Sequence, residues 1–378
     1  MLTVLGLFFR FKDLAGRGLT GDEIFQWNNT VGPLKPFWQR LPYGDMTAFP
    51  GEYLLTYPFV RFFGQNKWGL AIPHIIATVI GFYVLYLICR RYYKSSIGFL
   101  VAFTLVAFHE GLIFHSFEFR PYAVLPTLML MSFYLTERVV FDFKRLTTVQ
   151  KWLAAVFYIL TLWYHSFGIL IVGISFLYFG LLTRGRILTE SGRSFWMVLL
   201  SIALIALPVW IWYSLGPPNA ETPAMRVAGG KHPFEFCPNP FHGFGRFFNR
   251  MVLYNLTGFK RLYFLLSGLA LAWLVPFTQR MRRLGFFLTV ILLPVEVILF
   301  ASLANSYWFL LRQYIFLAPM FAFFLGWLWD GIYDYYVNLF RETRWRGWSW
   351  RERIGLILSG VCWFGGLAGW VSHVWKSL

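Results

Sequence analysis

Charged residues are scarce in this sequence, and acidic ones most of all. Only 13% of the 378 residues are charged, and 17 Asp and Glu stand against 34 Lys and Arg. Hydrophobic residues make up 58% of the chain and form long runs that few charges interrupt. Such runs are typical of transmembrane helices, because lipid offers backbone groups no hydrogen-bond partner outside the helix. The composition therefore predicts an all-α polytopic membrane protein in contact with membrane lipids.

Cysteine is also rare, and its placement excludes two kinds of site. Cys89, Cys237 and Cys362 lie far apart, and the chain has no Cys-x-x-Cys motif. This spacing indicates neither a disulfide framework nor a zinc site. The net charge of +17 does not indicate a nucleic-acid partner, since the basic residues form short clusters between apolar runs. The positive-inside bias of membrane proteins places basic residues there.

The apolar runs predict a single transmembrane domain that covers residues 1–378. Segment 1–9 is too short to span a bilayer alone, so we interpret it as a first helix that continues past Arg10 or is shortened at its start. Further spans are expected at 68–89, 96–113, 121–138, 150–164, 166–183, 195–214, 261–277, 284–304, 307–329 and 354–374. The chain is therefore expected to contain about ten or eleven transmembrane helices, each close to the length that a bilayer requires.

Basic clusters occupy every second loop between these segments. They lie at 90–94, 144–151, 184–193, 280–283 and 341–353. The positive-inside rule makes these loops cytoplasmic, including the loop 330–353 before the last helix. Alternation then places 11–67, 114–120, the turn at His165, 215–260 and 304–307 outside. Within the outer loops, 50–63 and a stretch around 244–254 are expected to be helices that lie along the membrane surface.

The unusual ionisable residues gather on this predicted outer side. They are Asp22, Glu23, Asp45, Glu52, His109, Glu110, His115, Glu118, Arg120, His165 and Arg312. Ionisable groups are costly beside apolar segments and tend to be functional. The inner acids have an ordinary explanation as solvated loop residues among Lys and Arg. These are Glu137, Asp142, Glu190, Asp330, Asp334, Glu342 and Glu352.

The turn before Pro121 is one candidate for substrate binding. Pro121 favours the first turn of the next helix and keeps Arg120 out of the preceding one. Glu118 and Arg120 would then share a tight turn at the mouth of the bundle. They form either a structural ion pair or a site in which the arginine grips a phosphate and the glutamate orients it.

Other positions stay open between a structural and a functional role. His165 is either a hydrogen-bonded turn residue or a site residue, and Arg312 is either an interfacial anchor or a second cation for a lipid headgroup. The His and Glu cluster at 109–115 could hold a divalent metal, although its spacing matches no strong metal motif. Glu296 lies inside a predicted span, where it either packs helices or belongs to a site.

Several short motifs occur in a particular order on the predicted outer side. They are the acidic pair Asp22-Glu23, the Glu-x-Arg-x-Tyr turn of Glu118, Arg120 and Tyr122, the twin short spans joined at Tyr164-His165, and the helix start with Arg312, Tyr314 and Pro319. Over roughly 10–330, this order resembles the GT-C membrane glycosyltransferases, especially the branch of protein O-mannosyltransferases and bacterial aminoarabinose transferases. The chain departs from that family in its short first helix and at 48–52, where the usual His and Pro-Pro run is replaced.

The resemblance implies a GT-C fold and an enzyme that moves a sugar from a polyprenyl-phosphate donor to a lipid, glycan or protein acceptor on the extracytoplasmic side. Asp22, beside Glu23, would be the catalytic base. The donor phosphate and substrate would be held by Glu118, Arg120, Tyr122, His165, Arg312, Tyr314, Asp45 and Glu52. The chemistry agrees, because one carboxylate must take the acceptor's proton and cations must stabilise the leaving phosphate. A divalent cation such as Mg or Mn is an open addition, and a single displacement would invert the anomeric centre.

Two other functions are consistent with the sequence. One is a transporter or flippase of lipid-linked glycans, which should show inverted repeats and more ionisable residues at the bilayer midplane. Only Glu296 fits that description. The other is a non-catalytic GT-C-like partner subunit, against which the intact Asp22 and Arg120 argue. We therefore expect a transferase in a bacterial inner membrane, with its site facing the periplasm.

Overall fold

A computed structural model describes most of the predicted helical part of the chain. The described residues are 1–12, 14, 16, 18–19, 23–24, 30, 50–63, 67–116, 120–183, 192–215, 277–304, 311–343, 349–350 and 352–357. Every regular element within these ranges is helical, and none of these residues lies in a strand. The predicted all-α class is therefore confirmed for the described chain.

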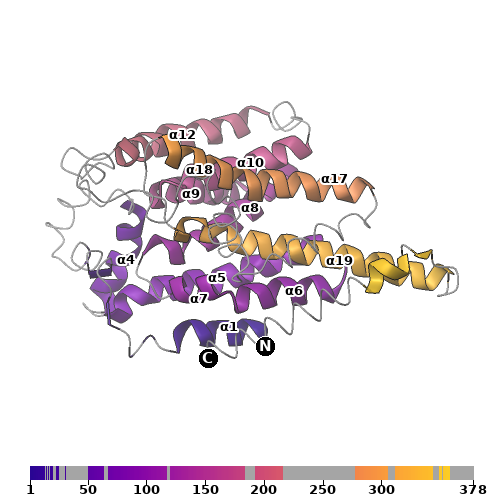
Figure 1. Ribbon diagram of the computed structural model, residues 1–378. Coiled ribbons are helices and arrows are strands. Elements are labelled where there is room, and N and C mark those ends of the chain that lie inside the picture. Colours follow the sequence, from indigo (N-terminus) through magenta and orange to yellow (C-terminus); the bar gives the residue numbers. More distant parts are fainter. Residues whose placement is uncertain are drawn as a thin grey trace.

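The described helices lie side by side in a bundle (Figure 1). The first half contains α1 (Leu2–Phe11), α4 (Pro50–Phe63), α5 (Lys67–Tyr92), α6 (Ser96–Ala107), α7 (Glu110–Ser116), the 3-10 turn η2 (Pro121–Ala123), α8 (Leu125–Asp142) and η3 (Phe143–Arg145). The second half contains α9 (Thr148–Tyr164), α10 (Gly168–Leu182), α12 (Gly192–Leu215), α17 (Phe277–Phe286), the π-helical turn η5 (Phe287–Leu292), α18 (Leu293–Ala304), the 3-10 segment η6 (Leu311–Leu317) and α19 (Ala318–Thr343). The expected spans at 261–277 and 354–374 lie wholly or largely outside the described residues.

Two described helices are long and apolar enough to cross a membrane by themselves. They are α5 and the helix running from Tyr314 to Arg341, which combines the end of η6 with α19. The expected span 96–113 is broken, because α6 and α7 meet at a bend of 52°. The two helices are long enough for a third membrane crossing only if they are taken as one span. The shorter apolar helices include α1 and α10. The chain is thus a membrane protein, and the larger number of spans stays a prediction.

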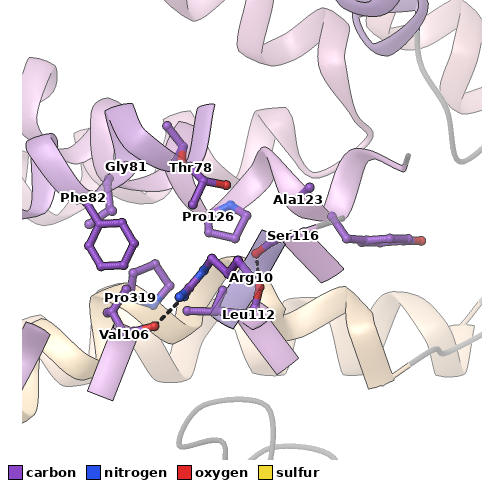
Figure 2. Close-up of a pocket in the computed structure, with 13 residues that line it drawn as sticks. Arg10, Thr78, Gly81, Phe82, Val106, Leu112, Ser116, Ala123, Pro126 and Pro319 are labelled. Carbon is purple, nitrogen blue, oxygen red and sulfur yellow. Dashed lines mark hydrogen bonds between the residues drawn. The ribbon is translucent and has the colours of Figure 1, made fainter. Parts of the chain in front are cut away.

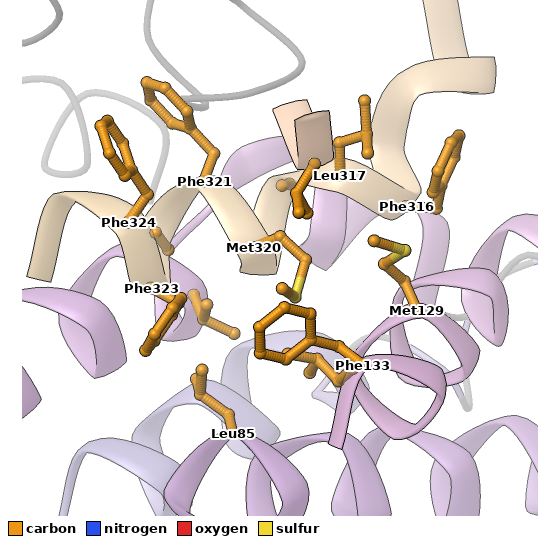
Figure 3. Close-up of a cluster of buried hydrophobic side chains, with 14 of the residues drawn as sticks. Leu85, Met129, Phe133, Phe316, Leu317, Met320, Phe321, Phe323 and Phe324 are labelled. Atoms are coloured by element: carbon orange, nitrogen blue, oxygen red, sulfur yellow. The ribbon is translucent and has the colours of Figure 1, made fainter. Parts of the chain in front are cut away.

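The core is built around the first half of α19. Met320, Phe321, Phe323 and Phe324 are fully or almost fully buried, and Phe133 of α8 lies among them (Figure 3). The Phe133 ring also packs against side chains of α10 and α17, so one residue connects four helices. Because the first half of α19 is surrounded by other helices, residues 318–329 are apolar on every face rather than along one stripe.

Small residues allow α6 and α19 to pack closely. A Cβ at Gly326 would lie 2.6 Å from the Gly98 carbonyl oxygen and 3.0 Å from the Ala102 Cβ. The backbones can approach this closely only because both positions are glycine, which is the usual way for membrane helices to gain packing contacts. The hydroxyl of Tyr93, in the connection between α5 and α6, donates a hydrogen bond of 2.7 Å to the Phe323 carbonyl of α19.

Charged residues connect the helices at the end where α5 meets α6. Asp330 of α19 is buried and accepts hydrogen bonds of 2.7 Å from the Ser95 amide and 3.0 Å from the Lys94 amide, so it caps α6. Glu137 of α8 is also buried, with its carboxylate 2.9 Å from the Arg91 guanidinium. The interpretation of these two acids as solvated loop residues is wrong. Both lie within helices, and α19 continues through 330–343 of the expected loop.

Candidate active site

The predicted site residues that the structure describes lie at the opposite end of the bundle, and all are buried. They are Glu23, Glu52, Arg120, Tyr122, His165 and Tyr314. Asp22, Asp45 and Glu118 fall outside the described residues. Arg312 belongs to η6, but its side chain is outside the described part of the chain.

Glu52 is held where the start of α4 touches the end of α9. A Cβ on Gly51 would lie 2.7 Å from the Tyr164 Cα and 2.9 Å from the Trp163 carbonyl oxygen, so only glycine permits this contact. The adjacent Glu52 side chain is fully buried. Its Oε2 accepts a hydrogen bond from the Tyr164 hydroxyl, and its Oε1 lies 3.0 Å from Nε2 of His74 in α5. Both carboxylate oxygens are therefore occupied by protein groups.

The proton positions on His74 follow from its partners. Its Nδ1 lies 2.8 Å from the Leu70 carbonyl oxygen, which can only accept, so Nδ1 must carry hydrogen. Nε2 and Glu52 then share one further proton, as an imidazolium facing a carboxylate or as a neutral ring facing a carboxylic acid. One buried ring thus joins α4 to α5.

His74 and Tyr164 were not among the predicted site residues. A usable signal for His74 was present, because it is an ionisable residue inside the apolar span 68–89, and such residues tend to face the bundle interior. No signal pointed to the Tyr164 hydroxyl, since the geometry that directs it to Glu52 depends on packing between α4 and α9.

His165 forms the turn between α9 and α10. Its carbonyl accepts a 2.8 Å hydrogen bond from the Gly168 amide, and a Cβ at Gly168 would collide with the Thr161 carbonyl oxygen. The ring Nδ1 accepts a 3.1 Å bond from the Phe167 amide, which places the proton of a neutral ring on Nε2. The prediction of a tight turn at His165 is confirmed, and the turn itself orients the ring.

Tyr122 connects this turn to the preceding helices. Its ring centroid lies 6.0 Å from that of His115 in α7 and 6.0 Å from that of His165. Arg120 precedes it with extended backbone angles of −137° and 158°, as expected for a residue before proline. η6, which contains Tyr314, packs against both η2 and α7. Residues distant in the sequence therefore meet at one buried end of the bundle.

A small pocket adjoins Tyr122 (Figure 2). Its polar lining consists of Arg10, Thr78, Ser116, Tyr122 and Thr127, among apolar neighbours. Arg10 donates hydrogen bonds to the Val106 and Ala107 carbonyls, beside the bend between α6 and α7. The arginine thus caps α6, and α1 ends one residue later instead of continuing far past Arg10.

The described residues do not support a metal at the cluster 109–115. No group of three or more His, Cys, Asp or Glu among them could hold a metal ion. His109 has a structural role instead, since its Nδ1 accepts a 3.2 Å hydrogen bond from the Leu112 amide and caps the start of α7. Glu296 is half-buried in α18.

Comparison with known proteins finds one family. Residues 50–212 match the family described as dolichyl-phosphate-mannose-protein mannosyltransferase. No curated protein matches the chain. The matched range runs from α4 to α12 and contains Glu52, His74, Arg120, Tyr122 and His165. Glu23 and Tyr314 lie outside it.

Proposed function

We propose that this protein transfers a sugar from a polyprenyl-phosphate carrier to a lipid, glycan or protein acceptor. Residues 50–212 match the dolichyl-phosphate-mannose-protein mannosyltransferase family, a family of GT-C membrane glycosyltransferases that use lipid-phosphate sugar donors. One observation carries the proposal. Glu52, Arg120, Tyr122 and His165 all belong to the matched range, and α4, η2 and the α9–α10 turn bring them to one buried end of the bundle.

The proposed reaction is a single displacement at the anomeric carbon. An acceptor hydroxyl attacks this carbon and passes its proton to Asp22, while the bond from the carbon to the phosphate oxygen breaks. The polyprenyl phosphate leaves with the bonding electron pair, so it needs a positive environment rather than an acid. Attack from the side opposite the leaving group inverts the anomeric configuration.

Cationic and aromatic groups would hold the donor. Arg120 is buried beside Tyr122 and would bind the phosphate with its planar guanidinium, with Arg312 of η6 as a second cation. Tyr122, His165 and Tyr314 would line the sugar. Glu118 and Asp45 belong to the same proposed set, as residues that orient the arginine and the substrate.

The proposed side of the membrane is the outer one. Arg91 and Lys94 lie at the opposite end of the bundle from the site residues, together with the Asp330 cap. By the positive-inside rule, that basic end faces the cytoplasm. The site would then open to the extracytoplasmic face, which in a bacterial inner membrane is the periplasm.

Transfer in proteoliposomes tests this proposal. Wild type and Asp22→Asn would be supplied with a panel of polyprenyl-phosphate sugars and a crude acceptor pool, and the product's anomeric configuration would be determined. We expect wild type to consume one donor with inversion and Asp22→Asn to consume none while remaining folded. Ser175→Ala, which removes a buried hydroxyl bonded only within α10 in the described chain, is the matched control.

Equal turnover by wild type and Asp22→Asn would reject Asp22 as base. Donor movement across the bilayer without transfer would indicate a flippase, and neither activity would indicate a partner subunit.

A further inference from the structure

His74 has no part in the proposed reaction, yet it begins a chain of hydrogen bonds that connects three helices. The ring is fully buried in α5, where its Nδ1 lies 2.8 Å from the Leu70 carbonyl oxygen. Its Nε2 lies 3.0 Å from Oε1 of Glu52 in α4. The other oxygen of this carboxylate accepts a hydrogen bond from the hydroxyl of Tyr164, the last residue of α9. We call His74, Glu52 and Tyr164 together the Glu52 brace.

The brace changes the role expected of Glu52. Each of its carboxylate oxygens is engaged by a protein group, and the side chain is fully buried. Apolar side chains would join α4, α5 and α9 at a lower desolvation cost, but they would not select one geometry as directional hydrogen bonds do. Glu52, predicted as a substrate-binding residue, is therefore better suited to fix the relative positions of these three helices.

Tyr164 is held at two points. Its hydroxyl bonds to Glu52, and its backbone packs against Gly51, where an added Cβ would lie only 2.7 Å from the Tyr164 Cα. A residue that is fixed both at its backbone and at the tip of its side chain cannot rotate about the end of its helix. Because His165 comes next in the chain, the brace fixes the point at which the chain enters the α9–α10 turn.

The other side of this turn is anchored as well. The Ser166 carbonyl accepts a 3.0 Å hydrogen bond from the indole of Trp210 in α12. Between the two anchors, the Phe167 amide donates to Nδ1 of His165 and sets the rotation of the ring. The ring centroid of His165 then lies 6.0 Å from that of Tyr122. The position of the His165 ring therefore depends on contacts with helices outside the turn.

We propose that His74 and Tyr164 are positioning residues for His165, acting through Glu52 to hold its ring against the donor sugar. The inference rests on the proposed function in that His165 lines the sugar. His74 belongs to a different helix from the turn and acts only through the brace. Loss of either link should therefore weaken donor binding by displacing His165, in addition to any loss of stability.

A double-mutant cycle in the proteoliposome assay, with the donor that wild type consumes, tests the link from the brace to His165. Tyr164→Phe removes the hydroxyl and keeps the ring, and we expect the KM for the donor to rise on the order of 3- to 30-fold, as for coupled groups in contact. In the His165→Gln background, Tyr164→Phe should change this KM no further, because the ring that it displaces is already absent. Tyr158→Phe, which removes a buried hydroxyl from the same helix, should leave the KM unchanged. An unchanged KM in Tyr164→Phe, or an equal rise in the His165→Gln background, would overturn the proposal.

Two substitutions of His74 test the other link. His74→Leu leaves Oε1 of Glu52 without this donor, while His74→Gln still offers one. We expect His74→Leu to raise the KM for the donor as Tyr164→Phe does, and His74→Gln to restore part of the loss. A role in stability alone would lower the unfolding temperature of His74→Leu without changing the KM, and that result would overturn the proposal.

A second measurement needs no activity. Diethyl pyrocarbonate modifies histidine rings, and mass spectrometry gives the rate at each position. His165 and His109 are equally buried, with 2% of each exposed, but only His165 follows the brace directly. We expect Tyr164→Phe to speed the modification of His165 severalfold with the His109 rate unchanged, and Tyr158→Phe to match wild type at both positions.

Two outcomes of this measurement would contradict the positioning role. They are equal His165 rates in wild type and Tyr164→Phe, and a parallel rise at His109, which would indicate general loosening of the bundle. If His165 alone responds but wild type consumes no donor, the brace still positions the ring and the proposed transferase function fails.

Discussion

The Tyr164 hydroxyl donates a hydrogen bond to the Glu52 carboxylate, so the last residue of α9 closes over the first turn of α4. This bond joins residues that are 112 positions apart, and both are fully or almost fully buried. A hydrogen bond to a buried charged group contributes more than a neutral one, because the charge is otherwise left in a medium that solvates it poorly. The bond is therefore expected to matter for both stability and activity.

Tyr164→Phe tests the energy of this bond. The variant removes one partner of Glu52 without changing the ring, and we expect the free energy of unfolding to fall by about 1.5–3 kcal/mol. Tyr158→Phe is the matched control, since Tyr158 lies in the same helix and its hydroxyl is 3.0 Å from the neutral Thr136 hydroxyl. Its loss should cost only about 0.5–1.5 kcal/mol. Denaturant titration in mixed micelles measures both, and equal losses would indicate that Glu52 is not charged in the folded protein.

Gly51→Ala tests the contact between α4 and α9. The added Cβ would meet backbone atoms of Trp163 and Tyr164, which cannot rotate away, so we expect a loss of about 1–3 kcal/mol and lower activity through displacement of Glu52. Gly173→Ala in α10 is the control, because no heavy atom lies within 4 Å of the Cβ it would add. It should be neutral or more stable, by up to about 1 kcal/mol. Thermal unfolding in detergent distinguishes the two, and a neutral Gly51→Ala would contradict the close contact.

Periodicity and local chemistry were sufficient to predict much of this fold. Apolar runs predicted α5, α9, α10 and α12 with ends close to those observed, and Pro121 predicted the extended backbone of Arg120. The break between α6 and α7 was not predicted. It depends on Arg10, which bonds to the carbonyls at the bend from a helix some hundred residues earlier. No local pattern contains that contact.

In the site, too, local sequence patterns predicted some features, while contacts between distant helices could not be predicted. Arg120, Tyr122 and His165 were expected at one end of the bundle because successive loops alternate between the two sides of the membrane. The basic clusters in the sequence show which loops share a side. The interpretation of Glu137 and Asp330 was wrong because nearby Lys and Arg residues indicate a solvated loop. The sequence around an acid does not show whether its side chain is buried, as both of these are. His74 was missed for a related reason. Its partner Glu52 lies in another helix, 22 positions away, and only packing between α4 and α5 brings the two side chains together.

Arg120→Lys tests phosphate binding at the proposed site. Lysine keeps the positive charge but loses the planar, two-pronged hydrogen-bonding group, so we expect the KM for the polyprenyl-phosphate donor to rise roughly tenfold, equivalent to about 1.4 kcal/mol. Arg61→Lys is the matched control, since Arg61 is exposed in α4 and should leave the KM unchanged. Initial rates over a range of donor concentrations give the answer. An unchanged KM in Arg120→Lys, with kcat also unchanged, would remove Arg120 from the donor site.

Asp330→Asn separates stability from catalysis, because Asp330 lies at the end of the bundle away from the site. Its carboxylate accepts from the amides of Lys94 and Ser95 and from the Ser95 hydroxyl, so it holds the start of α6 against α19. Replacing the charge weakens these bonds and is expected to lower the free energy of unfolding by about 1–3 kcal/mol. Asp334→Asn removes a pair with Lys94 that is partly exposed, and such pairs contribute about 0–1 kcal/mol. At a temperature where both variants remain folded, transfer rates should equal the wild-type rate. A selective fall in kcat for Asp330→Asn at that temperature would show instead that the two ends of the bundle are coupled through α19.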